Sequence, residues 1–191
     1  MSKIQNNPLL RGVSGMLGET MVIRKIRGKL QMANRPTQGR TASAKQAAIQ
    51  FKFQEAAQYA KMQTGKDALE ESKALYATGI TDKKHAARIV AMTDYLNAPK
   101  VHYIDAQDYS GGVDDTITVK ATDDFMVTGV KIVITDGNGT VIEKGEAVPE
   151  PTKVNLWTYK ATVANSTVAG TTIKATAFDR PGNATSLEKV I

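Results

Sequence analysis

The strongest chemical signal in the sequence is a run of basic residues between positions 24 and 40. The run consists of Arg24, Lys25, Arg27, Lys29, Arg35 and Arg40. No acidic residue lies among them, and Glu19 and Glu55 are the only acids before residue 67. Like charges at this density repel unless an anion lies between them, and arginine binds carboxylates in a bidentate geometry. The run is therefore predicted to bind an anionic partner.

Three interpretations of the basic run remain open: a solvated surface, a docking surface for an acidic protein, and a nucleic-acid contact. Aromatic side chains that would stack on bases are absent between residues 20 and 40, which disfavours nucleic acid. We favour a docking surface in which the six basic residues contact carboxylates. Reversing two of the charges, Arg27→Glu with Arg35→Glu, is then expected to abolish docking.

The other residue types that carry chemistry do not form a catalytic group. The chain has no cysteine, which excludes thiol catalysis, disulfides and cysteine-ligated metals. Its two histidines, His85 and His102, lack carboxylates at ligand spacing. Ser14 stands in G-V-S-G, which is not the G-x-S-x-G nucleophile elbow. We therefore expect no enzyme activity, no cofactor and no metal site.

Two further patterns favour structural roles over ligand binding. Gly12, Gly15 and Gly18 recur every three residues but match neither the dinucleotide fingerprint nor a P-loop, so we expect tight turns or close backbone packing. The acid pairs at 114–115 and 123–124 flank one expected strand. They are interpreted as solvated turn acids, although loop carboxylates at the end of a sandwich can also share a calcium ion.

The charge of the chain is distributed unevenly along it. Residues 1–100 contain 17 Lys and Arg against 7 Asp and Glu, a net charge of +10, whereas residues 101–191 contain 8 against 12, a net charge of −4. The 41% hydrophobic and 23% charged residues describe a globular chain, with no apolar run that would cross a membrane. The N-terminus lacks the apolar region of a secretory signal.

The C-terminal half shows the period-2 alternation of half-buried strands. Strands are expected over 116–121, 128–135, 140–143, 156–164 and 172–179. Asp-Gly-Asn-Gly at 136–139 predicts a tight hairpin turn between two of them. The expected core residues are Ile132, Ile134, Trp157, Tyr159 and Ile173.

The N-terminal half shows a different organisation. Residues 20–33 predict a short basic hairpin that turns at Arg27-Gly28, and Pro36 makes 34–40 an extended arm. Three alanine-rich helices are expected: from a cap at Thr41 or Ser43 to about 62, over about 67–77, and from after Thr81 to 97. Because their core would be thin, we expect this half to need a partner for stability.

Four stretches of the C-terminal half resemble a bacterial immunoglobulin-like module. They are residues 123–130 (D-D-F-M-V-T-G-V), 143–147 (E-K-G-E-A), 157–161 (W-T-Y-K-A) and 175–185 (A-T-A-F-D-R-P-G-N-A-T). The resemblance covers about residues 100–191 and implies an Ig-like β-sandwich that lacks the cysteine pair of antibody domains.

The N-terminal residues carry a second resemblance. Residues 7–15, 23–30 and 34–36, with N-P-L-L-R-G, I-R-K-I-R-G-K-L and N-R-P, are similar to small proteins of Bacteroidota and their tailed phages, crAss-like phages included. The similarity covers roughly residues 7–62. It implies a structural role in a virion or on a surface.

Together these observations predict an α+β chain of two domains. Residues 1–99 form a basic docking region with an arm, a hairpin and two to three helices, and residues 100–191 form an Ig-like β-sandwich. The expected function is that of a non-enzymatic virion structural protein, a head auxiliary or decoration protein that docks on the capsid and displays the Ig-like domain. A tail or fibre-attachment component and a basic nucleic-acid-associated protein are the alternatives.

The expected partner is the major capsid protein or another virion protein, with self-association into a homo-oligomer as a further expectation. Nucleic acid is disfavoured and no membrane is expected. The protein is expected to be made in the host cytoplasm and to be located in the virion.

Overall fold

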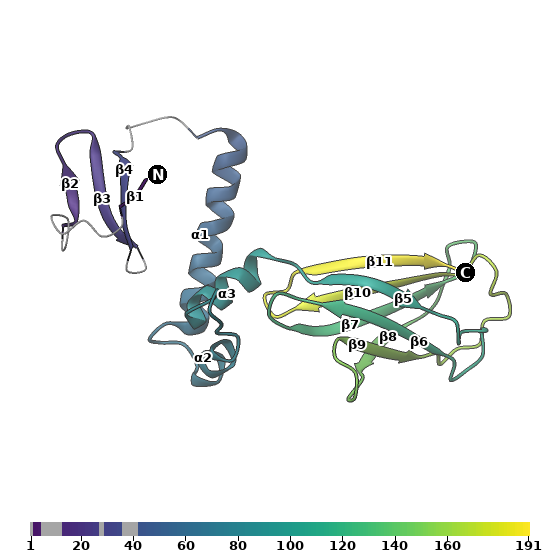
Figure 1. Ribbon diagram of the computed structural model, residues 1–191. Coiled ribbons are helices and arrows are strands. Elements are labelled where there is room, and N and C mark those ends of the chain that lie inside the picture. Colours follow the sequence, from purple (N-terminus) through teal and green to yellow (C-terminus); the bar gives the residue numbers. More distant parts are fainter. Residues whose placement is uncertain (1, 5–12, 27–28, 36–41) are drawn as a thin grey trace. The chain divides into compact units, whose positions relative to one another are not determined.

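The computed structural model describes residues 2–4, 13–26, 29–35 and 42–191, with side chains described from residue 13 onward. Over these residues the chain contains three helices and eleven strands, and every strand pair is antiparallel. The chain divides into two compact units, residues 1–45 and residues 46–191 (Figure 1). The predicted α+β class is confirmed.

The first unit is a small sheet built around the predicted hairpin. Its strands are β1 (Ser2–Ile4), β2 (Gly15–Leu17), β3 (Met21–Ile26) and β4 (Lys29–Asn34), in the order β1-β4-β3-β2. The hairpin of β3 and β4 pairs Met21 with Asn34 and Ile26 with Lys29, as its sequence predicted. Gly18, in the turn after β2, has a φ of 64° that other residues rarely adopt, so the tight turn expected from the glycine pattern is present there.

The second unit begins with the three predicted helices, α1 (Ala44–Thr64), α2 (Glu70–Ala77) and α3 (Ala87–Leu96). They enclose a small core of buried residues: Ala60, Tyr76, Val90 and Ala91. Gly79, which follows α2, lets the backbone pass close to this core. A Cβ there would lie 2.7 Å from Val90 and 2.8 Å from Phe125. None of the helices in the described part of the chain combines the length and apolar character that crossing a membrane requires.

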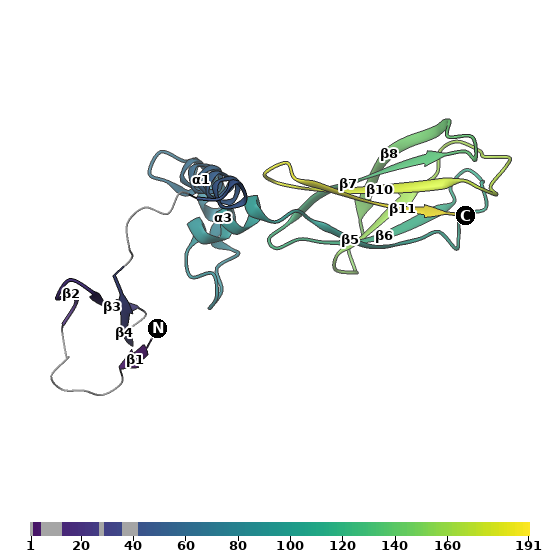
Figure 2. The same ribbon diagram turned by 90° about the horizontal axis from the view of Figure 1, so that it is seen from above.

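Seven further strands form an antiparallel β-sandwich. They are β5 (Lys100–Asp105), β6 (Thr116–Thr122), β7 (Val127–Thr135), β8 (Val141–Pro149), β9 (Leu156–Lys160), β10 (Thr172–Asp179) and β11 (Ala184–Val190), in the order β11-β10-β7-β8-β9-β6-β5. Strand β8 joins the two halves of the sandwich, because it pairs with β7 from Val141 to Ala147 and then with β9 through Val148 and Pro149. Figure 2 shows the same strands from above.

The sandwich core contains most of the residues predicted for it. Ile132, Ile134 and Ile173 are fully buried and Tyr159 is 6% exposed. Trp157 is only half-buried, so its prediction as a core residue is wrong in degree. The reason is its position opposite Pro149, where β8 leaves one half of the sandwich and the packing opens toward solvent.

The strand expected over 156–164 ends at Lys160. Beyond it the chain is held by side-chain contacts, since the backbone N–H and the Oγ1 of Thr162 donate to Glu143 Oε2 at 2.9 and 2.8 Å. Val163, predicted to face inward, is therefore 43% exposed. The expected domain boundary at residue 99 stays a prediction, because the helices and the sandwich belong to the same compact unit.

Candidate docking surfaces

The sheet of the first unit carries the predicted basic residues. Arg24 and Lys25 lie on β3, Lys29 begins β4 and Arg35 follows it, and all four are exposed. Arg27 and Arg40, together with most of the predicted arm, lie outside the described residues. The backbone N–H of Arg35 donates to Thr20 O at 2.6 Å, which fixes the chain where it leaves the sheet.

The strand register divides these cations between the two faces of the sheet. Arg24 is opposite Gln31, and Lys29 is opposite Ile26. Because opposed residues share a face and neighbours alternate, Arg24 and Lys29 lie on one face while Lys25 lies on the other. The structure thus brings together Arg24 and Lys29, and it separates them from Lys25.

No acid within the sheet neutralises these charges. Glu19 is the only acidic residue in the described stretches 13–26 and 29–35. The ion pairs formed by described residues join Lys73 to Glu70, Lys84 to Asp124 and Lys174 to Glu188, all in the second unit. The four described cations of the first unit are therefore available to an external anion.

The same sheet exposes apolar side chains. Among its described residues only Ile23, at 1% exposure, is buried. The pairs Leu17–Met21 and Gly15–Ile23 place Leu17 and Met21 on the face of Ile23, and their exposures are 49% and 36%. A sheet stabilised by so little buried surface is marginal by itself. A partner that covers this face would supply the missing burial.

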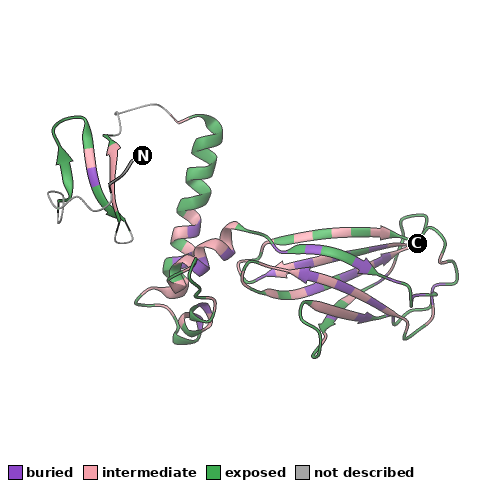
Figure 3. Cartoon of the chain, in the orientation of Figure 1, coloured by how far each residue is buried: buried purple, intermediate pink, exposed green. Residues whose placement is uncertain are grey.

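The first half of α1 is a second uncovered surface. Residues 44–54 are all exposed, including Ile49 at 69%, Phe51 at 61% and Phe53 at 53% (Figure 3). Ile49 and Phe53 continue, at spacings of four and three, the seam through which Ala56 and Ala60 pack against the other helices. The predicted apolar helix face therefore exists, but only its C-terminal half is covered within the chain.

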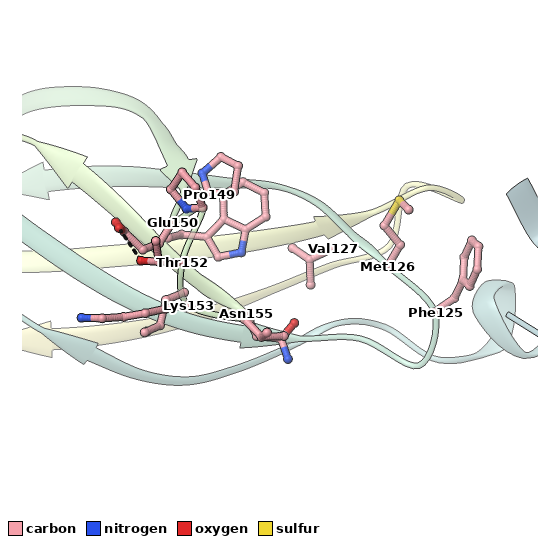
Figure 4. Close-up of a pocket in the computed structure, with 12 residues that line it drawn as sticks. Phe125, Met126, Val127, Pro149, Glu150, Thr152, Lys153 and Asn155 are labelled. Carbon is pink, nitrogen blue, oxygen red and sulfur yellow. Dashed lines mark hydrogen bonds between the residues drawn. The ribbon is translucent and has the colours of Figure 1, made fainter. Parts of the chain in front are cut away.

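A groove of about 340 Å³ lies beside Trp157, between the start of β7 and the connection from β8 to β9 (Figure 4). Its wall includes Phe125, Pro149 and Leu156. Glu150 is its only carboxylate, and it accepts a long hydrogen bond of 3.5 Å from Thr152 Oγ1. No histidine or second acid faces Glu150 among the groove residues, so this site provides no acid–base pair.

The candidates for chemistry that the sequence raised occupy structural positions. His102 Nε2 lies 2.6 Å from Thr122 Oγ1 on the neighbouring strand, and Ser14 is exposed. Asp115 Oδ2 accepts hydrogen bonds from Ser110 N and Gly112 N, both at 2.7 Å, and these bonds hold the pKa of Asp115 below its usual value. Among the described residues no group of three or more His, Cys, Asp or Glu has an arrangement that would bind a metal ion.

Sequence reasoning missed a polar network where the helices meet the sandwich. Asp94 on α3 is fully buried, and its Oδ2 accepts a hydrogen bond of 2.7 Å from the Tyr76 hydroxyl. Asn183 Nδ2, in the turn between β10 and β11, donates to Tyr95 O at 3.2 Å. An acid inside the apolar helix segment I-V-A-M-T-D-Y-L at 89–96 was the available signal. Its partners come from elements too distant in sequence to be paired by pattern.

No family model matches the sequence, and no curated protein matches it. Among solved structures, the chain is similar to CopC from Methylosinus trichosporium OB3b, at 15% identity and a TM-score of 0.36, over 47% of this chain and 87% of that chain. A similarity with this TM-score supports no inference about the fold or the function of the chain.

Proposed function

We propose that the chain is a non-enzymatic structural protein of a phage particle, a head auxiliary or decoration protein. Its first unit and the exposed half of α1 dock on a capsid protein, and the β-sandwich, of immunoglobulin-like type, is displayed. The resemblance of the N-terminal motifs to small proteins of tailed phages supports the virion as the setting.

The observation that carries the proposal is the exposed basic and apolar sheet of the first unit. One buried side chain, Ile23, cannot offset the conformational entropy of ordering four strands, which costs about 1–2 kcal/mol per residue. A partner surface that buries Leu17 and Met21 and places carboxylates near Arg24 and Lys29 would supply both missing contributions.

An acidic protein surface fits this sheet better than nucleic acid does. No Trp, Tyr or Phe occurs in the described part of the first unit, so the face of Arg24 and Lys29 offers no platform for bases. The exposed side chains beside the cations are aliphatic, which suits a protein interface with an apolar centre and a charged rim.

The immunoglobulin-like assignment of the sandwich is part of the proposal. It is supported by two antiparallel halves that share β8 and by a core made of alternate residues from each strand. The motif Asp179-Arg-Pro-Gly-Asn183 closes β10 through the hydrogen bond of 2.6 Å from Asn183 N to Asp179 Oδ1.

The test is incorporation into particles. The double variant Arg24→Glu with Lys29→Glu reverses the two cations that share a face, and Lys144→Glu with Lys160→Glu makes the same charge change at exposed positions of the sandwich. Mass spectrometry of purified particles should find the second variant at wild-type occupancy and the first one absent. Equal occupancy of both variants would refute docking through the basic sheet.

Binding of the purified full chain to duplex DNA is the matched alternative. If its binding constant falls with salt at a slope of several counterions, and Arg24→Glu with Lys29→Glu removes this binding, the nucleic-acid-associated function replaces the proposed one. Weak binding that is equal in both double variants supports a protein partner.

A further inference from the structure

Three acidic side chains from separate elements meet where the helices contact one end of the sandwich. Asp94 lies on α3, Asp123 follows β6, and Asp179 ends β10. Asp94 is fully buried, Asp179 is 4% exposed and Asp123 is half-buried. Close by, the rings of Tyr76 and Phe125 stack with their centroids 4.9 Å apart. The acids therefore lie at the contact between the two layers of this unit.

Most oxygens of this cluster have hydrogen-bond donors. The Oδ2 of Asp123 accepts from the backbone N–H groups of Phe125 and Met126 at 2.9 and 3.0 Å. Both oxygens of Asp179 are bonded, since Oδ1 accepts from Asn183 N at 2.6 Å and Oδ2 from Asn183 Nδ2 at 2.7 Å. The Oδ1 atoms of Asp94 and Asp123 are different: both are buried and neither has a partner among the described residues.

The two unpartnered carboxyl groups are within hydrogen-bonding reach of each other. Two ionised carboxylates have no proton to share and repel. A single proton would give both a partner, because a protonated carboxyl donates one O–H bond. The arrangement thus fits one bound proton.

The surrounding charges leave this proton as the neutralising species. Tyr59 on α1 bonds the Tyr76 hydroxyl at 2.7 Å, and both phenols are neutral donors. Arg180 lies over the Tyr76 ring at 5.8 Å, and Lys84 pairs with Asp124 at 2.7 Å. No cation forms an ion pair with the three acids among the described residues.

We propose that Asp94 and Asp123 share one proton, and that this proton holds the helices closed on the end of the sandwich. When it leaves, the two carboxylates and Asp179 repel across the contact of Tyr76 with Phe125, and the two layers separate there. The contact is a pH-sensitive joint that works independently of what the first unit binds.

The electrostatics place this change near neutral pH. Burial raises the pKa of Asp94 to about 7, against the opposing hydrogen bond from Tyr76, and the charges of Asp123 and Asp179 act in the same direction as burial. Burial also raises the pKa of Asp179.

The test uses the full chain with ¹³C-labelled aspartate and follows the carboxyl resonances from pH 4 to pH 9. One resonance, assigned to Asp94 by its loss in Asp94→Asn, should titrate near pH 7. Amide hydrogen exchange of α3, corrected for intrinsic rate, should be about tenfold faster at pH 8 than at pH 6, because opening is linked to the loss of one proton.

Asp94→Asn keeps a donor for Asp123 and an acceptor for Tyr76 but cannot titrate, so its exchange should be the same at both pH values. Asp108→Asn, at an exposed acid of the sandwich, should behave as the wild type. An Asp94 carboxyl that titrates near pH 4, or α3 protection equal at pH 6 and pH 8 in the wild type, would overturn the proposal. If Asp94→Asn does not fold, resonance assignment through the backbone of the unmutated chain gives the same decision.

Discussion

Removing residues 1–99 takes the helices away from the end of the sandwich and leaves the seven strands intact. Three contacts are lost with them. The Phe125 ring loses Tyr76, with centroids 4.9 Å apart. Asp124 loses its ion pair of 2.7 Å with Lys84. Asn183 Nδ2 loses the acceptor Tyr95 O at 3.2 Å.

The cost of these losses follows from the type of each contact. An aromatic pair contributes about 0.5–1.5 kcal/mol beyond its buried area, an uncharged hydrogen bond about 0.5–1.5 kcal/mol and a partly exposed ion pair about 0.2–1 kcal/mol. The sandwich core, with Ile132, Ile134 and Ile173 fully buried, does not depend on them. Residues 100–191 should therefore fold alone, with a free energy of unfolding about 2–4 kcal/mol below that of residues 43–191.

Urea unfolding followed by circular dichroism measures this difference. Phe125→Ala should lower the midpoint of 43–191 and leave that of 100–191 almost unchanged, because Phe125 is already exposed in the shorter chain. A chain of residues 100–191 without a cooperative transition would refute the reasoning, since the helices would then be part of the core. Equal effects of Phe125→Ala in both chains would show that its contact with the helices contributes nothing.

Three further outcomes are expected. Trp157→Ala should cost about 1–3 kcal/mol, less than the 2–5 kcal/mol of Ile132→Ala, because Trp157 is half-buried and Ile132 is fully buried; equal costs in thermal unfolding would contradict the burial difference. Because the pKa of Asp94 is raised to about 7, the folded chain binds more protons than the unfolded chain, and its free energy of unfolding should fall by about 3–4 kcal/mol from pH 4 to pH 7, measured by urea titration at each pH; a stability that rises over this range would contradict it. Glu143→Ala should cost about 2–4 kcal/mol, since it leaves the Tyr159 hydroxyl and the backbone N–H of Thr162 without their acceptor, whereas Glu143→Gln, which keeps an acceptor, should cost less than half as much.

Much of the local structure followed from the sequence alone. The β3–β4 and β7–β8 hairpins, the three helices and the burial of Ile132, Ile134 and Ile173 were predicted from alternation, turn residues and helical spacing. These features depend on neighbours in sequence, so a single chain reveals them. The exposed basic residues on β3 were predicted for the same reason, since a run of cations without acids has no burial available within its own segment.

Only the tertiary structure decided what lies at the junctions. The half-exposure of Trp157 results from β8 passing between the two halves of the sandwich, which alternation along one strand cannot express. Asp94, Asp123 and Asp179 meet although α3, β6 and β10 are far apart in the chain. Each appears as an ordinary acid in its own segment. Their coupling arises because burial removes the water that would otherwise screen three charges from one another.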